Sequence, residues 1–193
     1  YEDFSRLLTS NFAEIPSVRA RARLEAGLMF RHRNLIEMIG ICEYSPSKGP
    51  IFIVSNLVQG VNLDVFVRNN LRGREHFIRN VCKCFYPVLD ALDYLHGKDI
   101  FHLDIKPSNI MVENGSNIRL MDLGIAAVDS GNEASASGLL GTPEYAAPEQ
   151  CLVSGHHMTI DATTDIYETG VTLYEMLTGE NPYYAPTMSR IID

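Results

Sequence analysis

The chain has 193 residues, a length that corresponds to roughly one domain. Hydrophobic residues make up 46% of it and charged residues 21%, which suffices for a full-sized core and disfavours intrinsic disorder or a collagen-like repeat. The net charge of −8 argues against a nucleic-acid partner, and the absence of any run of about 18 apolar residues predicts no membrane segment.

The charge is distributed unevenly along the chain. Residues 1–103 carry 13 basic and 11 acidic side chains, whereas residues 104–193 carry 3 basic and 13 acidic ones. The second half is therefore expected to attract cations. The four cysteines show no CxxC pair and no spacing typical of secreted disulfide proteins, so we expect reduced thiols and a cytoplasmic location.

The first half of the chain predicts one helix followed by two strands. Pro16 and Ser17 precede a helical pattern over residues 18–31, with Ser17 as the N-cap. Two short apolar runs, residues 35–42 and 51–55, are separated by a Ser/Pro/Gly-rich turn and predict a β-hairpin.

Helices dominate the predicted elements that follow. Residues 62–69 predict a short helix. Apolar residues then recur every three or four positions from Phe77 to Leu95 and predict one long helix, with Pro87 inside it and Gly97 as its C-cap. A second apolar helix is expected from Asp165 onward, and residues 123–149 are expected to form one long loop.

Residues 109–122 predict a second hairpin with polar residues at its open end. Two four-residue runs, 110–113 and 118–121, flank the turn 114–117. If residue 113 pairs with residue 118, Asn109 and Asp122 face each other with their Cα atoms about 5 Å apart. An amide oxygen beside a carboxylate suits Mg²⁺ that is bound together with substrate phosphates, although a polar hairpin end without a metal is commoner.

Three ordered motifs extend this pattern. Asp104 and Lys106 lie in HLDIKPSNI, MDLG follows at residues 121–124, and GTPEYAAPE spans residues 141–149. Together they resemble the catalytic loop, the magnesium loop and the end of the activation segment of eukaryotic-type serine/threonine protein kinases. The resemblance implies an α+β fold in which residues 1–55 form part of the N-lobe and residues 56–193 form the C-lobe.

The resemblance assigns roles to five residues around the transferred phosphoryl group. Asp104 would accept or orient the proton of the attacking hydroxyl, and Lys106 would neutralise charge on the phosphoryl group. Asn109 and Asp122 would hold Mg²⁺. Thr142 would bridge Asp104 and Lys106, an arrangement of the serine/threonine branch.

Further roles follow from the same resemblance. For ATP, the Asn56 carbonyl and the Val58 N–H would meet the adenine, with Met111 under the ring. Glu25 would be the glutamate of the N-lobe helix, which pairs with a strand lysine. Asp165 would tie down the catalytic-loop backbone.

The substrate is expected to be a protein, with a preference for basic residues around the acceptor Ser or Thr. The acidic second half supports this preference, as does Glu175, which matches an acidic position of basophilic kinases. Ser108 and Asn62 stand at two other such positions and do not add to it. The oligomeric state does not follow from the sequence.

The chain departs from the family pattern in its first part. No two of its 14 glycines are spaced two apart, and the first lysine is Lys48, so neither a Gly-rich loop nor the strand lysine is present. We therefore expect an excerpt of a longer chain, truncated at both ends and weak or inactive alone. Leu103 replaces the arginine that receives a phosphorylated activation loop, so activity independent of loop phosphate is expected.

Two alternatives stand beside the kinase interpretation. A small-molecule kinase of the aminoglycoside or choline type also uses His-x-Asp with a downstream Asn and Asp, but it lacks Lys106 and the segment at 141–149. A pseudokinase that acts as a binding or scaffold module would fold in the same way without transferring phosphate. Against the pseudokinase, all four chemical positions of the large lobe are intact.

Overall fold

The structure of the chain is a computed structural model that describes residues 30–43, 51–123, 141–151 and 160–184. The chain divides into two compact units, Tyr1–Arg31 with Ile36–Leu57, and His32–Leu35 with Val58–Asp193. Residues 32–35 therefore belong with the second unit, although the lobe boundary is expected after residue 55. The helix predicted over residues 18–31 falls almost wholly outside the described residues, and its last two positions, Phe30 and Arg31, are not helical.

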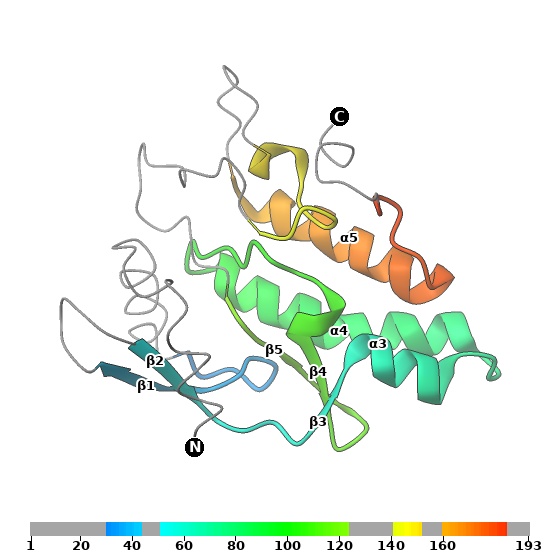
Figure 1. Cartoon of the computed structure of the whole chain (residues 1–193), viewed down its shortest axis with the longest axis horizontal. Coiled ribbons are helices and arrows are strands. Elements are labelled where there is room, and N and C mark those ends of the chain that lie inside the picture. The colour runs from blue at the N-terminus through cyan, green and yellow to red at the C-terminus, as the bar shows by residue number, and fades with distance from the viewer. Residues whose placement is uncertain (1–29, 44–50, 124–140, 152–159, 185–193) are drawn as a thin grey trace, which may run out of the picture. The chain divides into compact units, whose positions relative to one another are not determined.

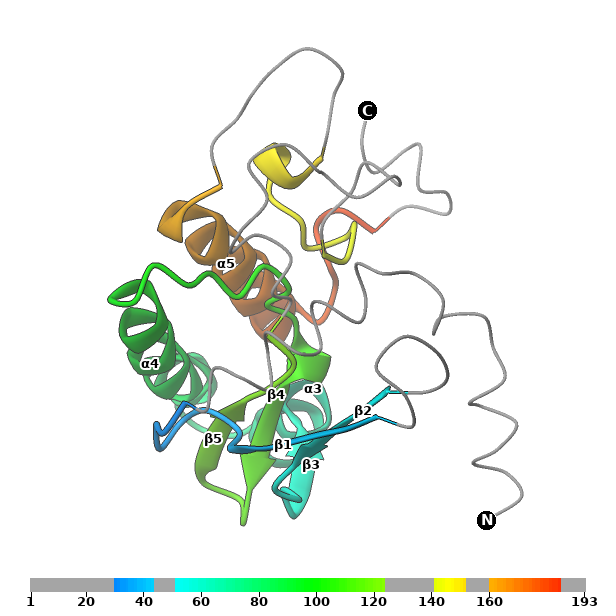
Figure 2. The same ribbon diagram turned by 90° about the vertical axis from the view of Figure 1, so that its left-hand side faces the viewer.

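The first unit contains a two-stranded antiparallel ribbon (Figure 2). Strand β1 (Met38–Glu43) pairs with β2 (Ile51–Ser55), with Cys42 opposite Phe52. The predicted pair of strands is confirmed. After β2, the Asn56 N–H donates to the Glu37 carbonyl at 3.0 Å, which extends the backbone pairing by one step.

A three-stranded antiparallel sheet forms one side of the second unit. Its order is β3 (Gly60–Asn62), β4 (Ile110–Glu113) and β5 (Asn117–Leu120). Strand β3 is not predicted from the sequence, because three residues are too few to show an alternating pattern. At Gly60 a side chain would collide with the Val112 carbonyl oxygen, so the close approach of β3 to β4 requires glycine at this position.

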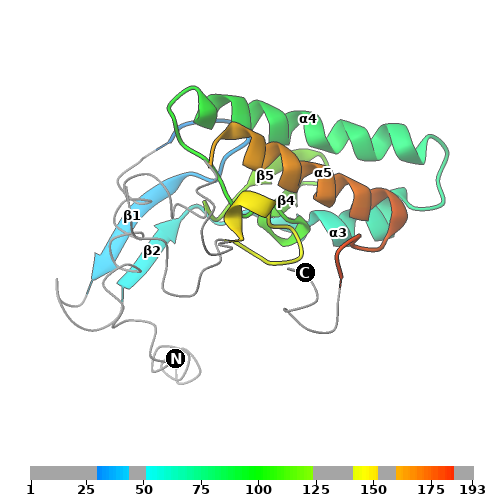
Figure 3. The ribbon, with the colours of Figure 1, turned by 90° about the horizontal axis from the view of Figure 1, so that it is seen from above.

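Helices cover the sheet. The short α3 (Leu63–Phe66) continues into a π-helical turn, Val67–Leu71, and α4 (Phe77–His96) and α5 (Ala162–Thr178) lie side by side (Figures 1 and 3). The predicted long helix is confirmed as α4, which contains Pro87 and is followed by Gly97 as its C-cap. Helix α5 begins three residues before the predicted start at Asp165, because the Asp161 side chain caps it by accepting from the Thr163 N–H at 2.7 Å.

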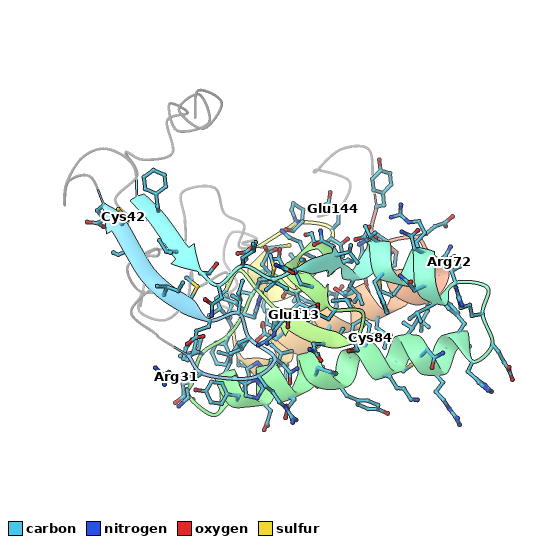
Figure 4. The ribbon with its side chains drawn as sticks, turned by 90° about the horizontal axis from the view of Figure 1, so that it is seen from below. Arg31, Cys42, Arg72, Cys84, Glu113 and Glu144 are labelled. Carbon is cyan, nitrogen blue, oxygen red and sulfur yellow. The ribbon has the colours of Figure 1, made fainter. Side chains whose placement is uncertain are left out.

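The core of the second unit lies between α4, α5 and the sheet. The apolar stripe of α4 is buried, as are the inward-facing residues of β4 and β5. Figure 4 labels the buried Cys84 on α4, and it marks β4 by its last residue, the half-buried Glu113. The buried members are Val81, Cys84, Phe85, Val88, Ala91, Leu92 and Leu95 of α4, with Ile110, Val112, Ile118 and Leu120 of the sheet. This packing holds α4, α5 and the hairpin as one scaffold for the loops between them.

None of the helices in the described residues is both long and apolar enough to cross a lipid bilayer.

Candidate active site

The loop between α4 and β4 carries the first of the predicted site residues. Residues 102–106, the Asp104 loop, have no regular secondary structure and lead into one 3-10 turn, Pro107–Asn109. Proline suits the first position of such a turn because its missing N–H is not needed there. The Asn109 N–H donates to the Lys106 carbonyl at 3.0 Å, and the turn brings the Asn109 side chain back onto Asp104.

Three side chains meet around the Asp104 carboxylate. Asn109 Nδ2 donates to it at 2.9 Å, and Lys106 Nζ lies 2.8 Å from it. The Thr142 hydroxyl donates to its other oxygen at 2.6 Å and accepts from Lys106 Nζ, also at 2.6 Å. The predicted bridge by Thr142 between Asp104 and Lys106 is therefore present. Two hydrogen bonds and one ion pair fix the orientation of this carboxylate, and the Asp104 and Lys106 side chains stay only partly exposed, at 19% and 23%.

The backbone of the Asp104 loop is anchored by Asp165 of α5. This fully buried carboxylate accepts from the N–H groups of His102 at 2.9 Å and Leu103 at 2.8 Å. The His96 ring lies 2.7 Å from one of its oxygens. The predicted role of Asp165 in tying down this backbone is confirmed.

Leu103 adopts a backbone conformation that needs such support. Its φ of 62° lies in the left-handed region, which costs an L-residue roughly 1–2 kcal/mol. Asp165 holds its N–H, and the buried Gln150 donates from Nε2 to its carbonyl at 3.0 Å. At Gly141, φ is 81° and a Cβ would come within 2.6 Å of the Leu103 carbonyl oxygen, so the segment after residue 140 also packs closely here.

Two further α5 residues hold the backbone after Asp104. The Ile105 N–H donates to Glu168 at 2.7 Å, and the Thr172 hydroxyl donates to the Ile105 carbonyl at 3.1 Å. The sequence analysis missed both. The signal was available, because residues 165, 168 and 172 form a polar stripe at helical spacing in a helix that is otherwise largely apolar, and all three are fully buried.

His102 connects the Asp104 loop to the chain after β5. Its ring Nδ1 lies 3.3 Å from the Asp104 N–H, and its Nε2 lies 3.0 Å from the Met121 carbonyl. These partners require a ring that accepts at Nδ1 and donates at Nε2. Burial lowers the pKa of His102, against the pull of the nearby Asp165, Asp104 and Asp122, and so favours this neutral form.

The second hairpin forms, but its predicted register is wrong by one residue. Glu113 pairs with Asn117, and Ile110 pairs with Leu120. Asn114 and Gly115 have φ values of 51° and 74°, and the Ser116 N–H donates to the Glu113 carbonyl at 3.2 Å. These two left-handed residues close the turn in three residues instead of four.

The correct register puts Met121, not Asp122, opposite Asn109. The Met121 N–H donates to the Asn109 carbonyl at 2.9 Å, and Asp122 follows with a φ of 54° and an exposed side chain. The left-handed backbone at Asp122 turns the chain out of the strand direction. The predicted Asn109–Asp122 cross-strand pair is thus incorrect, although both residues lie at the open end of the hairpin.

The donor chemistry at this end still fits Mg²⁺. The Asn109 Nδ2 is used by Asp104, which leaves its Oδ1 as a ligand, and the Asp122 carboxylate is exposed. In the described part of the chain, no three His, Cys, Asp or Glu side chains gather into a metal site. An amide oxygen and one carboxylate match an ion that takes its other ligands from phosphate and water. The assignment of Asn109 and Asp122 as metal ligands stays a prediction.

The predicted adenine contacts are distributed over both units. Asn56 belongs to the first unit, and Val58 and Met111 belong to the second. Met111 lies on the face of β4 opposite the buried Ile110 and Val112 and is half-buried. These contacts stay predictions, and Glu25 lies outside the described residues.

The segment 141–151 links the site to α5. The Thr142 carbonyl accepts from the N–H groups of Tyr145 and Ala146, both at 2.9 Å. The Tyr145 hydroxyl donates to Glu175 at 2.6 Å, and burial, followed by the Glu175 bond, raises the pKa of Tyr145. Glu175, expected to meet a basic substrate, therefore already supports this segment with one carboxylate oxygen.

The chain is similar to one family of known proteins. The family profile of the protein kinase domain matches residues 14–193. The chain is 32% identical over 188 residues to serine/threonine-protein kinase PknB of Mycolicibacterium smegmatis, covering 92% of this chain and 28% of that protein. It is 32% identical over 172 residues to serine/threonine-protein kinase TIO of Arabidopsis thaliana, covering 89% of this chain and 12% of that protein. The chain thus spans about a quarter of the length of the first relative and about an eighth of the length of the second.

Proposed function

The chain belongs to the protein kinase domain family, and on this premise we propose that it is part of a serine/threonine protein kinase that transfers the γ-phosphoryl group of ATP to a protein hydroxyl. One observation carries the proposal: Asp104, Lys106, Asn109 and Thr142 form a single hydrogen-bonded cluster. Phosphoryl transfer is catalysed mainly by positioning and by fixed charge, and this cluster supplies both.

Each member of the cluster has a part in the proposed reaction. The Asp104 carboxylate accepts or orients the proton of the attacking hydroxyl, for which it has lone pairs beyond its two hydrogen bonds and its ion pair. The Lys106 ammonium offsets negative charge that develops on the transferred group. Thr142 and Asn109 hold the carboxylate in one orientation, so little reorganisation is needed when the substrate arrives.

The family implies that ATP is the phosphoryl donor and that Mg²⁺ is the metal ion. Asn109 Oδ1 and the Asp122 carboxylate would hold the ion, which when bound neutralises phosphate charge. The Asn56 carbonyl, the Val58 N–H and Met111 are proposed to receive the adenine, and Glu25 to be the glutamate of the N-lobe helix. Because the sequence holds no Gly-rich loop and no strand lysine, we propose that this chain alone transfers phosphate weakly or not at all.

The substrate is proposed to be a protein with basic residues near the acceptor. The excess of acidic side chains in residues 104–193 supports this preference, although Glu175 shares its carboxylate with Tyr145. A peptide array in which Arg or Lys near the acceptor makes no difference would remove it. All four cysteines are free thiols, which suits a reducing compartment such as the cytoplasm.

The experiment that tests the function uses the full-length protein. Phosphate transfer from Mg²⁺-ATP to a generic basic protein is measured for the wild type, for Asp104→Asn, and for Asp93→Asn as a matched control on the exposed side of α4. We expect Asp104→Asn to lower kcat by about 10²–10⁴-fold, the range typical of a lost general base. Asp93→Asn should match the wild type.

The same experiment separates the proposal from the scaffold alternative. A full-length protein that binds nucleotide or a protein partner but transfers no phosphate above the level of Asp104→Asn would be a pseudokinase. Transfer to a small hydroxyl compound and not to protein would indicate a small-molecule kinase.

A further inference from the structure

Helix α5 presents a second buried carboxyl group to the Asp104 loop. Glu168 follows Asp165 by three residues, so both lie on one face of the helix, and the Glu168 side chain is fully buried. Its Oε2 accepts from the Ile105 N–H at 2.7 Å. Its Oε1 is buried and has no hydrogen-bond partner in the part of the chain that the structure describes.

In the described part of the chain, the groups that face Glu168 are neutral or negative. Asp165 lies on its own helix and Asp104 on the loop, and the segment 141–150 contributes the uncharged Gly141 and the Gln150 amide. The ammonium group of the loop, Lys106, is bonded to Asp104 and Thr142. Burial, the larger cause, and the two carboxylates raise the pKa of Glu168 to about 8, against the Ile105 hydrogen bond and the nearby Gln150 amide, which lower it. The raised pKa favours the neutral carboxylic acid at pH 7.

Asp104 stands between two backbone anchors on α5. On its N-terminal side, Asp165 holds the N–H groups of His102 and Leu103. On its C-terminal side, Glu168 holds the N–H of Ile105, and Thr172 holds the Ile105 carbonyl. The direction in which the Asp104 side chain leaves the backbone depends on both anchors.

We propose that Glu168 is a positioning residue for the proposed phosphoryl transfer, because its carboxyl group fixes Asp104 by holding the Ile105 N–H. The assignment of a catalytic consequence rests on the proposed function, whereas the anchoring of the loop does not. Glu168 touches no reacting atom in this proposal and acts only through the Asp104 loop.

The proposal predicts that rising pH lowers the stability of the fold up to about pH 8 and lowers kcat above it. Between the ordinary pKa of a glutamate and about 8, the folded protein keeps a proton that the unfolded chain has lost, so rising pH lowers the stability of the fold. Above about pH 8 the buried group ionises beside Asp104 and Asp165. Repulsion among three carboxylates then loosens the loop, and kcat falls.

Three variants of the full-length protein test the proposal. Glu168→Ala removes the acceptor of the Ile105 N–H, and Glu168→Gln keeps an acceptor but cannot ionise. Thr169→Val is the control, because the hydroxyl of this buried residue, next to Glu168 on α5, donates to the Asp165 carbonyl of its own helix. For each variant, kcat and the KM for ATP are measured from pH 6 to 9, and amide hydrogen exchange is measured over residues 102–106.

Glu168→Ala is expected to lower kcat about 10- to 100-fold per folded molecule, with an unchanged KM for ATP, as a small displacement of a catalytic group does. Exchange at the Ile105 amide should become faster. Glu168→Gln should stay within about threefold of the wild type at pH 7, where the neutral form of Glu168 is favoured, and should lack the loss of kcat above about pH 8. Thr169→Val should keep the wild-type profile.

Two results would overturn the proposal. One is a loss of kcat above about pH 8 that Glu168→Gln retains unchanged; the other is protection of the Ile105 amide that survives in Glu168→Ala. The exchange measurement needs no activity, so it decides the anchoring role even if the full-length protein transfers no phosphate. In that case the proposed function fails while the anchoring role is judged separately. If Glu168→Ala does not fold, the pH dependence of thermal unfolding in Glu168→Gln decides, and a slope equal to that of the wild type overturns the proposal.

Discussion

Asp104 accepts hydrogen bonds from Asn109 and Thr142 and forms an ion pair with Lys106, whereas Asp122 has an exposed carboxylate that none of the described side chains contacts by a hydrogen bond. The Asp104 loop is also anchored through its backbone by Asp165 and Glu168. Asp122, in contrast, lies at the end of the hairpin and itself adopts the left-handed backbone conformation, with a φ of 54°. The two acids of the candidate site are thus held in different ways.

The difference indicates a division of tasks. A group that takes a proton gains from being fixed before the substrate arrives, because reorganisation would add to the barrier. A carboxylate that binds a hydrated ion together with phosphates needs exposure and freedom to adjust. Substitution of Asp122 should therefore lower activity with little effect on stability. Substitution of a residue that holds Asp104 or its loop, such as Asp165, should lower stability as well.

The largest of three further effects is expected at Asp122, where activity should change much more than stability. Asp122→Ala should lower kcat by about 10²–10³-fold through loss of charge at the phosphates, as removal of one electrostatic contact does in other enzymes. Its free energy of unfolding should fall by no more than about 1 kcal/mol, because the side chain is exposed and only the left-handed backbone at residue 122 disfavours alanine relative to aspartate. Transfer assays over a range of Mg²⁺ concentrations, run beside calorimetry, measure both. A large loss of stability would show that Asp122 is a structural residue and would contradict the comparison.

A loss of both stability and activity is expected at Asp165. Asp165→Ala leaves the buried N–H groups of His102 and Leu103 and the His96 ring without their acceptor. The free energy of unfolding should fall by about 3 kcal/mol, since each unsatisfied buried donor costs roughly 1–3 kcal/mol. Denaturant titration gives the value. The exposed Asp93→Asn serves as the control, and equal midpoints for the two variants would refute the anchoring role.

The smallest of the three effects is expected at Thr142. Thr142→Ala removes one of the two hydrogen bonds to the Asp104 carboxylate but leaves Lys106 and Asn109 in place, so kcat should fall by roughly 10-fold, equivalent to about 1.4 kcal/mol. Thr142→Ser keeps the hydroxyl and should restore most of the activity. Steady-state kinetics at saturating ATP distinguish the two variants, and a Ser variant as slow as the Ala variant would mean that the methyl group matters more than the hydrogen bond.

Much of the Asp104 side of the site was predictable because its members are close in sequence or belong to a motif with fixed spacing. Asp104, Lys106 and Asn109 lie within one loop and one 3-10 turn, so local geometry alone brings them together.

The register of the hairpin was not predictable by counting residues. Asn114 and Gly115 both adopt left-handed backbone, which shortens the turn and moves every partner by one position.

The amino-acid sequence by itself determined helix α4, the existence of the two hairpins, and the placing of Lys106 and Asn109 beside Asp104, because hydrophobic periodicity and short-range motifs act over a few residues. Only the tertiary structure decided that Glu168, Gln150 and Thr172 hold the Asp104 loop. These contacts join residues 47 to 67 positions apart. These contacts stabilise the fold because they satisfy backbone N–H and C=O groups of the loop. Those groups become buried only when α5 and the segment 141–151 pack against the loop.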